Sequence, residues 1–363
     1  MRFDLFAGRI SAFLARARKP YRLAVCSISL CLLFVSLTLR AAELLAPESL
    51  DRLALSALIS RPTGSSPDPI SGISVPQSPQ SNLLYDAEIL IIDTPEGEAP
   101  QTQDPTLPIY RLDLSGAELE LRNTETPFAP DLSALLSAPY PAASDPDGPV
   151  VLILHTHGTE SYSADGVGYT DDTPFRTTDT DRNVVAVGRV LADELNRRDI
   201  PTLHCQIMHD AEDYNSSYEL ARRTIEDYLA RYPSIRYIID LHRDAIIRSD
   251  RSMIAPCADT PDGRAAQLML VVGTDAFGAD HPSWQDNLNI ACKLQSRLNA
   301  EYPLARPINL RGASFNQQYR VGSMLLEVGS CGNTLDEAKR AVRLFAAAFA
   351  DLLADCDPAA FGN

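Results

Sequence analysis

The sequence predicts an α/β protein with a mainly parallel sheet and helices on both faces of the sheet. Residues 150–154 (VVLIL) form a fully apolar run, which is typical of a strand buried on both sides. Segments with apolar residues at helical spacing alternate with such runs, and 45% of all residues are hydrophobic, enough for a sizeable core. Because strands and helices alternate along the chain, we expect βαβ units.

The main domain is expected at residues 147–356. Its strands are predicted at residues 150–154, 201–207, 236–241, 268–272 and 324–328. Its helices are predicted at residues 183–197, 218–232, 284–302 and 335–354, where apolar residues recur along one face. Residues 83–146 hold only short strand-like runs, 87–92 and 117–121, and we interpret them as an ancillary region.

The N-terminal part of the chain is organised differently. Residues 1–22 carry six basic side chains and one acid, and residues 23–39 carry no charge. We interpret them as a cytoplasmic segment and a single-pass transmembrane anchor, followed at residues 40–82 by a stalk rich in Pro, Ser and Gly. A cleaved signal peptide is the competing interpretation, but a cut after Ala42 would put Arg40 where a small residue is needed. Both interpretations place the main domain outside the cytoplasm.

The charge and the cysteines exclude some classes of protein. The net charge is −16, and the basic residues gather at the N-terminus, so the rest of the chain is more acidic still. Such a body would repel a phosphate backbone, which argues against nucleic acid as a partner. Of the seven cysteines, five lie outside residues 23–39 without any C-x-x-C pair, so we expect small buried residues and no disulfide framework.

Chemistry-bearing residues follow or end three of the predicted strands. His157 lies in HTHGTESY after the first strand, His242 directly follows residues 236–241, and Glu327 lies in MLLEVGS. Because ligands bind beyond the carboxyl ends of strands in open α/β sheets, we expect the three to converge. Two imidazoles and one carboxylate, with a position open to water, are typical of a catalytic zinc site. Glu327 suits the proton transfer that accompanies amide hydrolysis.

The third metal ligand stays open at this level. Glu160 lies three residues after His157, and Asp181 lies just before the helix predicted at 183–197, so either carboxylate is a candidate. Taken singly, each of these residues also has a structural interpretation, because strand-end histidines commonly form hydrogen bonds and a glutamate can cap a turn. There is no G-x-S-x-G or H-E-x-x-H motif, which argues against a serine hydrolase and a thermolysin-like protease.

Three residues beside these segments are candidates for contacts with a substrate: His155, Arg243 and Asn316. His155 precedes His157 by two residues, so in a strand the two would share a face. His155 is therefore a candidate either to support a ligand or to contact the substrate. Arg243 has an alternative role in an ion pair with its neighbour Asp244.

Four segments together resemble the stage II sporulation protein P family: HTHGTESY, DRNVVAVGRVLADELNRRDI, IIDLHRDA and FNQQYRVGSMLLEVGSCGNTLDEAKRAV. The resemblance covers about residues 120–356. It implies a fold similar to that of zinc-dependent N-acetylmuramoyl-L-alanine amidases, with zinc as cofactor and peptidoglycan as substrate. It also implies endopeptidase action on cross-links and a role in septal wall thinning and engulfment, alongside other septal membrane proteins.

The resemblance assigns roles to single residues. The amidase pattern GHGG is similar to the HG pair at His157, the amidase SIHAN segment is similar to DLHRDA around His242, and the closing amidase glutamate is similar to Glu327. The amidase ligand that opens the first helix is a glutamate, whereas Asp181 stands at the equivalent place here and is one methylene shorter. The resemblance therefore favours Asp181 as the third ligand and keeps Glu160 as the alternative.

Two other functions remain compatible with the sequence. One is a catalytically silent, wall-binding scaffold of a septal complex, although His157, His242 and Glu327 are all present. The other is a metal carboxypeptidase that trims stem peptides from their ends. The residues indicate hydrolysis of an amide more firmly than they indicate which amide is cut.

Overall fold

The structure is a computed structural model and describes residues 90–91, 109–140, 147–164, 175–250 and 252–362. All of these lie in the second of two compact units, Gln77–Asn363. The predicted basic segment, membrane anchor and stalk lie outside the described residues. Within the part that is described, no helix is both long and apolar enough to span a membrane.

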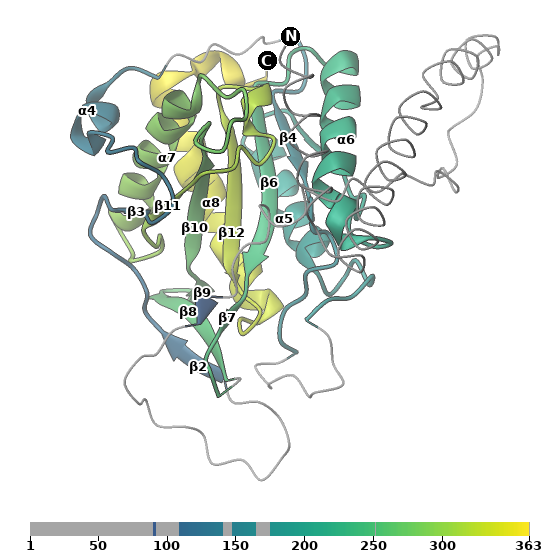
Figure 1. Cartoon of the computed structure of the whole chain (residues 1–363), viewed down its shortest axis with the longest axis vertical. Helices are drawn as coiled ribbons and strands as arrows, with labels where there is room; N and C mark the ends of the chain where they lie inside the picture. The colour runs from purple at the N-terminus through teal and green to yellow at the C-terminus, as the bar shows by residue number, and fades with distance from the viewer. Residues whose placement is uncertain (1–89, 92–108, 141–146, 165–174, 251, 363) are drawn as a thin grey trace, which may run out of the picture. The chain divides into compact units, whose positions relative to one another are not determined.

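Seven strands form the larger sheet, in the order β3-β11-β10-β12-β6-β4-β5 (Figure 1). They are β3 (Leu121–Asn123), β4 (Val151–Leu154), β5 (Thr202–His204), β6 (Tyr237–Asp244), β10 (Leu268–Gly273), β11 (Ile308–Arg311) and β12 (Ser323–Ser330). The five predicted strands of the main domain are confirmed as β4, β5, β6, β10 and β12.

Strand direction in the larger sheet differs from the prediction at one pair of neighbouring strands. β10 and β12 run antiparallel, whereas the other neighbouring pairs run parallel. The sheet is therefore mixed, which corrects the expectation of a mainly parallel one. The physical reason is the connection 312–322, which holds only the 3-10 helix η2 (Gln317–Tyr319). A parallel return needs a longer crossover, usually a helix, so the chain after β11 comes back in the opposite direction.

A second, smaller mixed sheet has the order β1-β7-β8-β2, with β9 paired to β8. Its strands are β1 (Leu90–Ile91), β2 (Ile109–Leu112), β7 (Ile246–Ile247), β8 (Met253–Thr260) and β9 (Gly263–Ala266). Only β1 falls in a run that the sequence predicts. Pro256 lies inside β8, and because a proline within an apolar run argues against a strand, the sequence pattern does not predict β8.

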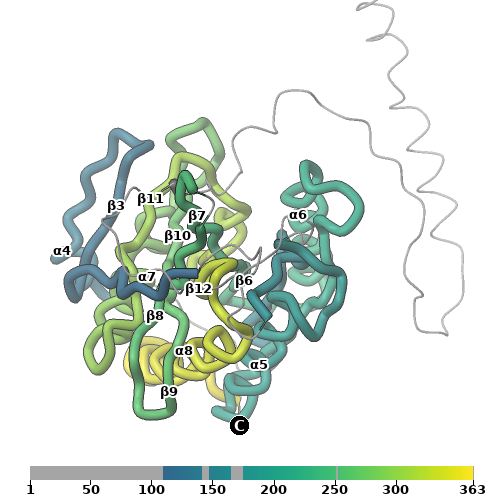
Figure 2. The backbone as a smooth tube through the Cα atoms, turned by 90° about the horizontal axis from the view of Figure 1, so that it is seen from below, coloured from purple at the N-terminus to yellow at the C-terminus, as the bar shows by residue number. Residues whose placement is uncertain are grey.

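Helices cover both faces of the larger sheet (Figures 1 and 2). The four predicted helices are confirmed within a few residues, and the helices are α4 (Leu132–Ser137), α5 (Val184–Asn196), α6 (Ser217–Arg231), α7 (Trp284–Asn299) and α8 (Leu335–Cys356). Two further 3-10 turns are η1 (Tyr214–Ser216) and η3 (Pro358–Ala360). Val151 and Ile153 of β4 share a core with α5, α7 and α8, whereas Leu152 and Leu154 pack with α6.

The alternation of side chains along β6 and β12 separates a core face from a polar face. On β6, Ile239 and Leu241 belong to the core under α5 and α8, so Asp240 and His242 point to the opposite face. On β12, Leu326 belongs to the same core, and Glu327 points away from it. The polar residues therefore collect on the α6 side of the sheet, near the ends of these strands.

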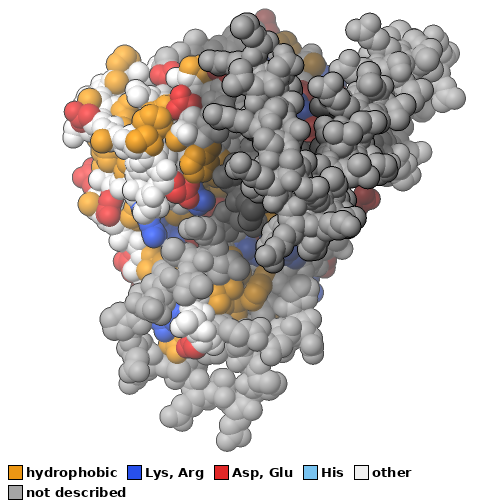
Figure 3. Space-filling view, viewed as in Figure 1, with side chains coloured by type: hydrophobic (Ala, Val, Ile, Leu, Met, Phe, Trp, Pro, Cys, Tyr) orange, Lys and Arg blue, Asp and Glu red, His pale blue; other side chains and the backbone are white. Residues whose placement is uncertain are grey.

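The outer surface around α4 and β3 has a different character from this polar face. Figure 3 shows apolar and acidic side chains interspersed there, with a few basic ones, over the described part of this view.

Candidate metal centre and active site

Three adjacent strands bring His157, His242 and Glu327 together. β12, β6 and β4 are neighbours and run parallel to one another. Glu327 is the direct partner of His242 across the β12–β6 pair, and the ring centroids of His157 and His242 are 5.3 Å apart. All three side chains are buried. Convergence at one sheet edge thus places three chemistry-bearing side chains in a single buried cluster.

The loop after β4 is fixed by two buried aspartates. Asp240 of β6 accepts hydrogen bonds from the backbone N and the Oγ1 of Thr156, at 2.8 and 2.6 Å. Asp210 accepts the same two kinds of bond from Thr159, at 3.0 and 2.5 Å. Each threonine therefore ties both its backbone and its side chain to one carboxylate. His157 lies between these two anchored positions, so its place in the loop is well determined.

His157 has a buried, neutral ring, whose Nδ1 lies 3.9 Å from Asp210 Oδ2. Only 3% of the residue is exposed to solvent, yet neither Nδ1 nor Nε2 makes a hydrogen bond with a described residue. Burial, and then the positive charge of His242, hold the pKa of His157 well below its usual range. The ring stacks on Tyr214 at a centroid distance of 4.3 Å. A buried, neutral and unpartnered imidazole of this kind has lone pairs available for a metal ion.

His242 lies in a negative environment. Its Nε2 is 3.0 Å from Asp240 Oδ1, an ion-pair contact without the direction of a hydrogen bond, and its Nδ1 is 3.6 Å from Glu160 Oε2. Burial alone would lower the pKa of His242, but Asp240, Glu160 and Glu327 outweigh it and raise the pKa to about 10. The carboxylates thus hold a positive charge at this position, here as a proton on the ring.

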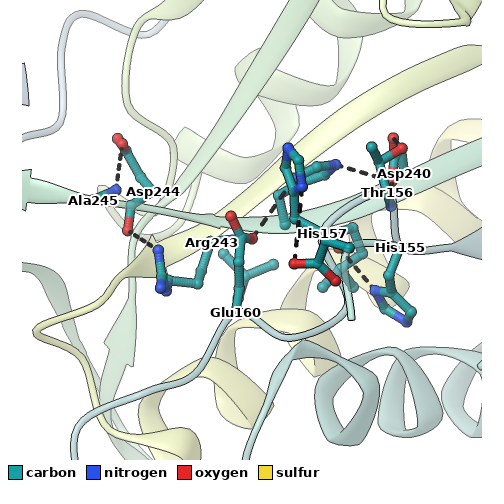
Figure 4. Close-up of polar contacts among 12 residues, drawn as sticks. His155, Thr156, His157, Glu160, Asp240, Arg243, Asp244 and Ala245 are labelled. Atoms are coloured by element: carbon teal, nitrogen blue, oxygen red, sulfur yellow. Dashed lines mark hydrogen bonds and ion pairs between the residues drawn. The ribbon is translucent and has the colours of Figure 1, made fainter. Parts of the chain in front are cut away.

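Of the two carboxylates proposed as third ligand, the structure brings only Glu160 to the histidines. Glu160 is buried, and its Oε2 accepts a hydrogen bond from the backbone N of Arg243 at 2.9 Å (Figure 4). The side chain of Asp181 is 79% exposed and pairs with Arg189 at 3.0 Å. The resemblance favoured Asp181, and the geometry instead supports Glu160, because the turn before α5 directs Asp181 to the surface.

The ring of His155 lies outside the cluster formed by His157, His242 and Glu327. Figure 4 shows its ring pointing away from His157, because β4 ends at Leu154 and the chain then turns. Its Nδ1 lies 2.8 Å from the carbonyl oxygen of Leu241, and its Nε2 lies 2.9 Å from His204 Nε2. The ring is completely buried. The expectation that His155 and His157 occupy one strand face is therefore wrong, and His155 has no surface on which to contact a substrate.

Arg243 and Asn316 also bond to the protein itself. Arg243 donates from Nε to the carbonyl oxygen of Ser161 at 2.9 Å and from Nη2 to that of Phe175. Asn316 donates from Nδ2 to the carbonyl oxygen of Tyr218 at 2.9 Å. Arg243 is buried and follows His242, so it points to the other side of β6. These contacts support a structural role for both side chains in place of the predicted contacts with a substrate.

Glu327 is the side chain best suited to proton transfer. It is 2% exposed, and its Oε2 has no hydrogen-bond partner among the described residues. Burial and the neighbouring carboxylate of Asp244 raise the pKa of Glu327 to about 8, although the charge of His242 opposes the rise. A carboxyl group with a pKa near neutrality both accepts and releases a proton readily. Glu327 and His242 line the same cavity, which has a volume of about 250 Å³.

The donor chemistry of this cluster fits a divalent cation such as zinc. Nδ1 and Nε2 of His157 are buried and make no hydrogen bond with a described residue, which is costly unless something binds them. Nε2 of His242 contacts Asp240, and its Nδ1 faces Glu160. Five buried carboxylates (Glu160, Asp210, Asp240, Asp244 and Glu327) surround this cluster against three arginines (Arg176, Arg243 and Arg306), so carboxylates outnumber guanidinium groups around the two histidines. In the described ranges, no group of three or more His, Cys, Asp or Glu side chains is already arranged to hold a metal ion.

Two functional residues were not predicted from the sequence. Asp240 precedes His242 by two residues, so the D-x-H spacing in a strand places both on one face, and this pattern marks the pair. Asp210 lies in the loop after β5, far from His157 in sequence. No local pattern marks it, because its role depends on contacts with Thr159 and Arg176 that form only in the fold.

Comparisons with known proteins give one family and several distant structures. A family model described as stage II sporulation protein P matches residues 95–350. Stage II sporulation protein P of Bacillus subtilis (strain 168) is 28% identical over 230 residues, which are 60% of this chain and 54% of that protein. The match therefore spans about half the length of this relative.

Two solved structures show a low overall similarity. The apo form of an N-acetylmuramyl-L-alanine amidase from Mycobacterium abscessus is 12% identical, with a TM-score of 0.34, and the match covers 57% of this chain and 98% of that chain. The catalytic domain of an N-acetylmuramoyl-L-alanine amidase from Bacillus (Paenibacillus) polymyxa var. colistinus is 12% identical, with a TM-score of 0.31 and coverages of 58% and 99%. Similarities this low carry no argument about activity.

Proposed function

This chain belongs to the stage II sporulation protein P family, and from that premise we propose that it is a zinc-dependent peptidoglycan hydrolase. The proposed reaction is that of an N-acetylmuramoyl-L-alanine amidase, with endopeptidase action on peptide cross-links as a second activity. One observation carries the proposal: His157, whose ring nitrogens make no hydrogen bond with a described residue, lies beside His242 and the carboxylates of Glu160 and Glu327 in one buried cluster.

In the proposed reaction, different residues of the chain have different roles in amide hydrolysis. His157, His242 and Glu160 would hold the ion, which when bound would activate water and polarise the amide carbonyl. Asp240 orients the His242 ring by its contact with Nε2. Glu327 takes the proton of the attacking water at its unpartnered Oε2 and passes it to the leaving amine. Burial of these groups keeps bulk water from competing for that proton.

The proposed setting is the outer face of a cell membrane. The uncharged residues 23–39 support a single-pass anchor, and the stalk at residues 40–82 would let the domain reach the cell wall. Family membership supports a role in septal wall thinning and engulfment during sporulation, together with other septal membrane proteins. Extraction of the protein from membranes by detergent, but not by alkaline carbonate, would support the anchor.

The test of the activity uses the purified full chain and isolated sacculi, with products identified by mass spectrometry. We expect intact stem peptides to be released with zinc, release to stop with a chelator, and zinc to restore it. His242→Ala should lose both bound zinc and activity. Glu327→Gln should keep its zinc while the rate falls by about 10²–10⁴-fold, because only the proton-transfer group is removed.

Other outcomes would identify the competing functions. Free D-alanine as the sole product would point to a metal carboxypeptidase. Binding to sacculi without release of any product, with or without zinc, would point to a wall-binding scaffold and would overturn the proposal. Full activity of His242→Ala would overturn the metal assignment alone.

A further inference from the structure

The cavity that contains Glu327 and His242 extends beyond them along β10, β11 and β12. One wall is apolar and includes Val271 and Leu325. The lining also includes the buried guanidinium of Arg306 and the carboxylate of its partner Asp244. A mainly apolar cavity with a few placed polar groups is typical of a site that fixes the orientation of a small ligand.

Arg306 has hydrogen-bonding capacity that the described residues leave unused. The residue is 4% exposed, and its Nη1 donates to Asp244 Oδ2 at 2.8 Å. Its Nε and Nη2 have no hydrogen-bond partner in the described part of the chain. Buried donors without partners are destabilising, so two of them on one guanidinium call for an explanation.

The position of Arg306 is fixed before any ligand arrives. Its backbone N donates to the carbonyl oxygen of Leu268 at 2.7 Å, and its carbonyl oxygen accepts from Nε2 of Gln295 at 2.8 Å. Its partner Asp244 is held in turn by the backbone N of Ala245 at 2.7 Å. The guanidinium therefore loses little conformational entropy when it binds, which is the condition for selective recognition.

We propose that Arg306 binds a carboxylate on the peptide part of the substrate, through Nε and Nη2, next to the reacting amide. This inference rests on the proposed function and adds a determinant of specificity to it. Nε and Nη2 of a guanidinium form a planar fork that matches the two oxygens of a carboxylate. Asp244 occupies only Nη1, so this fork stays open. Stem peptides carry free carboxylates close to the glycan-linked alanine, and an alanine methyl suits the apolar wall.

The test compares two substrates that differ in one charge. The purified full chain is given glycan-linked stem peptides whose second residue bears either a free α-carboxylate or its amide. We expect kcat/KM to favour the acidic substrate by about 10–100-fold, the range for charge-assisted hydrogen bonds. Arg306→Gln should remove this preference, so that the ratio of kcat/KM on the acidic substrate to kcat/KM on the amide falls to about one.

Two further variants separate recognition from folding. Arg306→Gln leaves Asp244 without its partner, so the double variant R306Q/D244N, which removes the pair together, is measured in parallel with thermal unfolding. Arg297→Gln is the matched control, because Arg297 pairs with Asp355 at 2.7 Å at an exposed site on α7. This control should keep the full preference for the acidic substrate.

A binding measurement makes the inference independent of catalysis. Calorimetry of the metal-free full chain with the dipeptide L-Ala-γ-D-Glu should show tighter binding than with its α-amide, and Arg306→Gln should abolish the difference. Equal binding of both dipeptides by the wild type, or equal losses on both substrates in R306Q and R306Q/D244N, would overturn the inference. If the wild type cleaves nothing yet binds the acidic dipeptide through Arg306, the inference stands and the proposed hydrolase activity fails.

Discussion

At the scale of single residues, the site is governed by the way burial and charge act on His242. Three carboxylates, those of Asp240, Glu160 and Glu327, raise its pKa to about 10 against the opposing effect of burial. The metal-free ring therefore carries a proton at neutral pH. A divalent cation that replaces this proton would interact favourably with the same carboxylates. The electrostatic environment therefore favours a positive charge here, either as the ring proton or as a metal ion.

Glu160 and Asp181 form a matched pair of tests for the third ligand. We expect Glu160→Gln to weaken zinc binding by at least roughly tenfold, because a buried carboxylate 3.6 Å from His242 is removed. Asp181→Asn removes the same charge from a side chain that is 79% exposed, so zinc affinity and stability should stay unchanged. Competition with a chromogenic chelator measures both affinities. Weaker zinc binding in Asp181→Asn alone would restore the ligand that the family resemblance favours.

At the scale of an element, a bulge in β12 determines where Glu327 lies in the site. The register of the β12–β6 pair shifts between Glu327 and Ser330, and Gly329 lies in the bulge with a φ of 67°. A Cβ at Gly329 would lie 2.6 Å from Asn333 Oδ1 and 2.8 Å from the Cβ of Ala266. The left-handed backbone and the close packing both require glycine here. The bulge ends regular pairing directly after Glu327 and so sets its position.

Gly329→Ala should therefore destabilise the protein by about 2–4 kcal/mol, from left-handed strain and overpacking together. Gly278→Ala is the matched control, because Gly278 also has a positive φ, of 86°, but no atom lies within 4 Å of the position that a Cβ would take there. The control should lose only about 1–2 kcal/mol, from left-handed strain alone. Urea denaturation of the full chain measures both values. Equal losses in the two variants would show that packing around the bulge is not tight.

At the scale of the whole molecule, a buried histidine links the stability of the fold to pH. His281 is 1% exposed, and its Nε2 lies 3.2 Å from Nδ2 of Asn287 on α7, a donor that requires the neutral ring. Asn287 in turn accepts from the backbone N of Gly322, just before β12. Burial lowers the pKa of His281 to about 4, although the carboxylate of Asp275 opposes the change.

The sign of the pH effect follows from this lowered pKa. The unfolded chain binds a proton at His281 near pH 6.5, and the folded chain does so only near pH 4, so the contribution is present above pH 6.5 and is lost as the pH falls toward 4. Between pH 7.5 and pH 5, we expect this group to lower the free energy of unfolding by about 2 kcal/mol. His281→Gln keeps an acceptor and cannot titrate, so it should lose that part of the pH dependence. Identical pH profiles of the wild type and His281→Gln would contradict the assignment.

The sequence by itself determined the elements of the main domain and the core of the candidate site. Apolar periodicity is a local property, so it identified the central strands and the four long helices. The placement of His157 and His242 after apolar strands, and of Glu327 within one, was enough to predict that they converge. The same local pattern places Asp240 on the face of His242, two residues away in the strand.

Only the tertiary structure decided which neighbours these residues have. It made the sheet mixed, added a second sheet, brought Glu160 to His242 and sent Asp181 to the surface. It also paired Arg306 with Asp244 across 62 residues of sequence. The physical reason is the range of the interactions. Periodicity acts over a few residues, whereas burial and charge pairing depend on segments that are distant in the chain and meet only when the sheet is assembled.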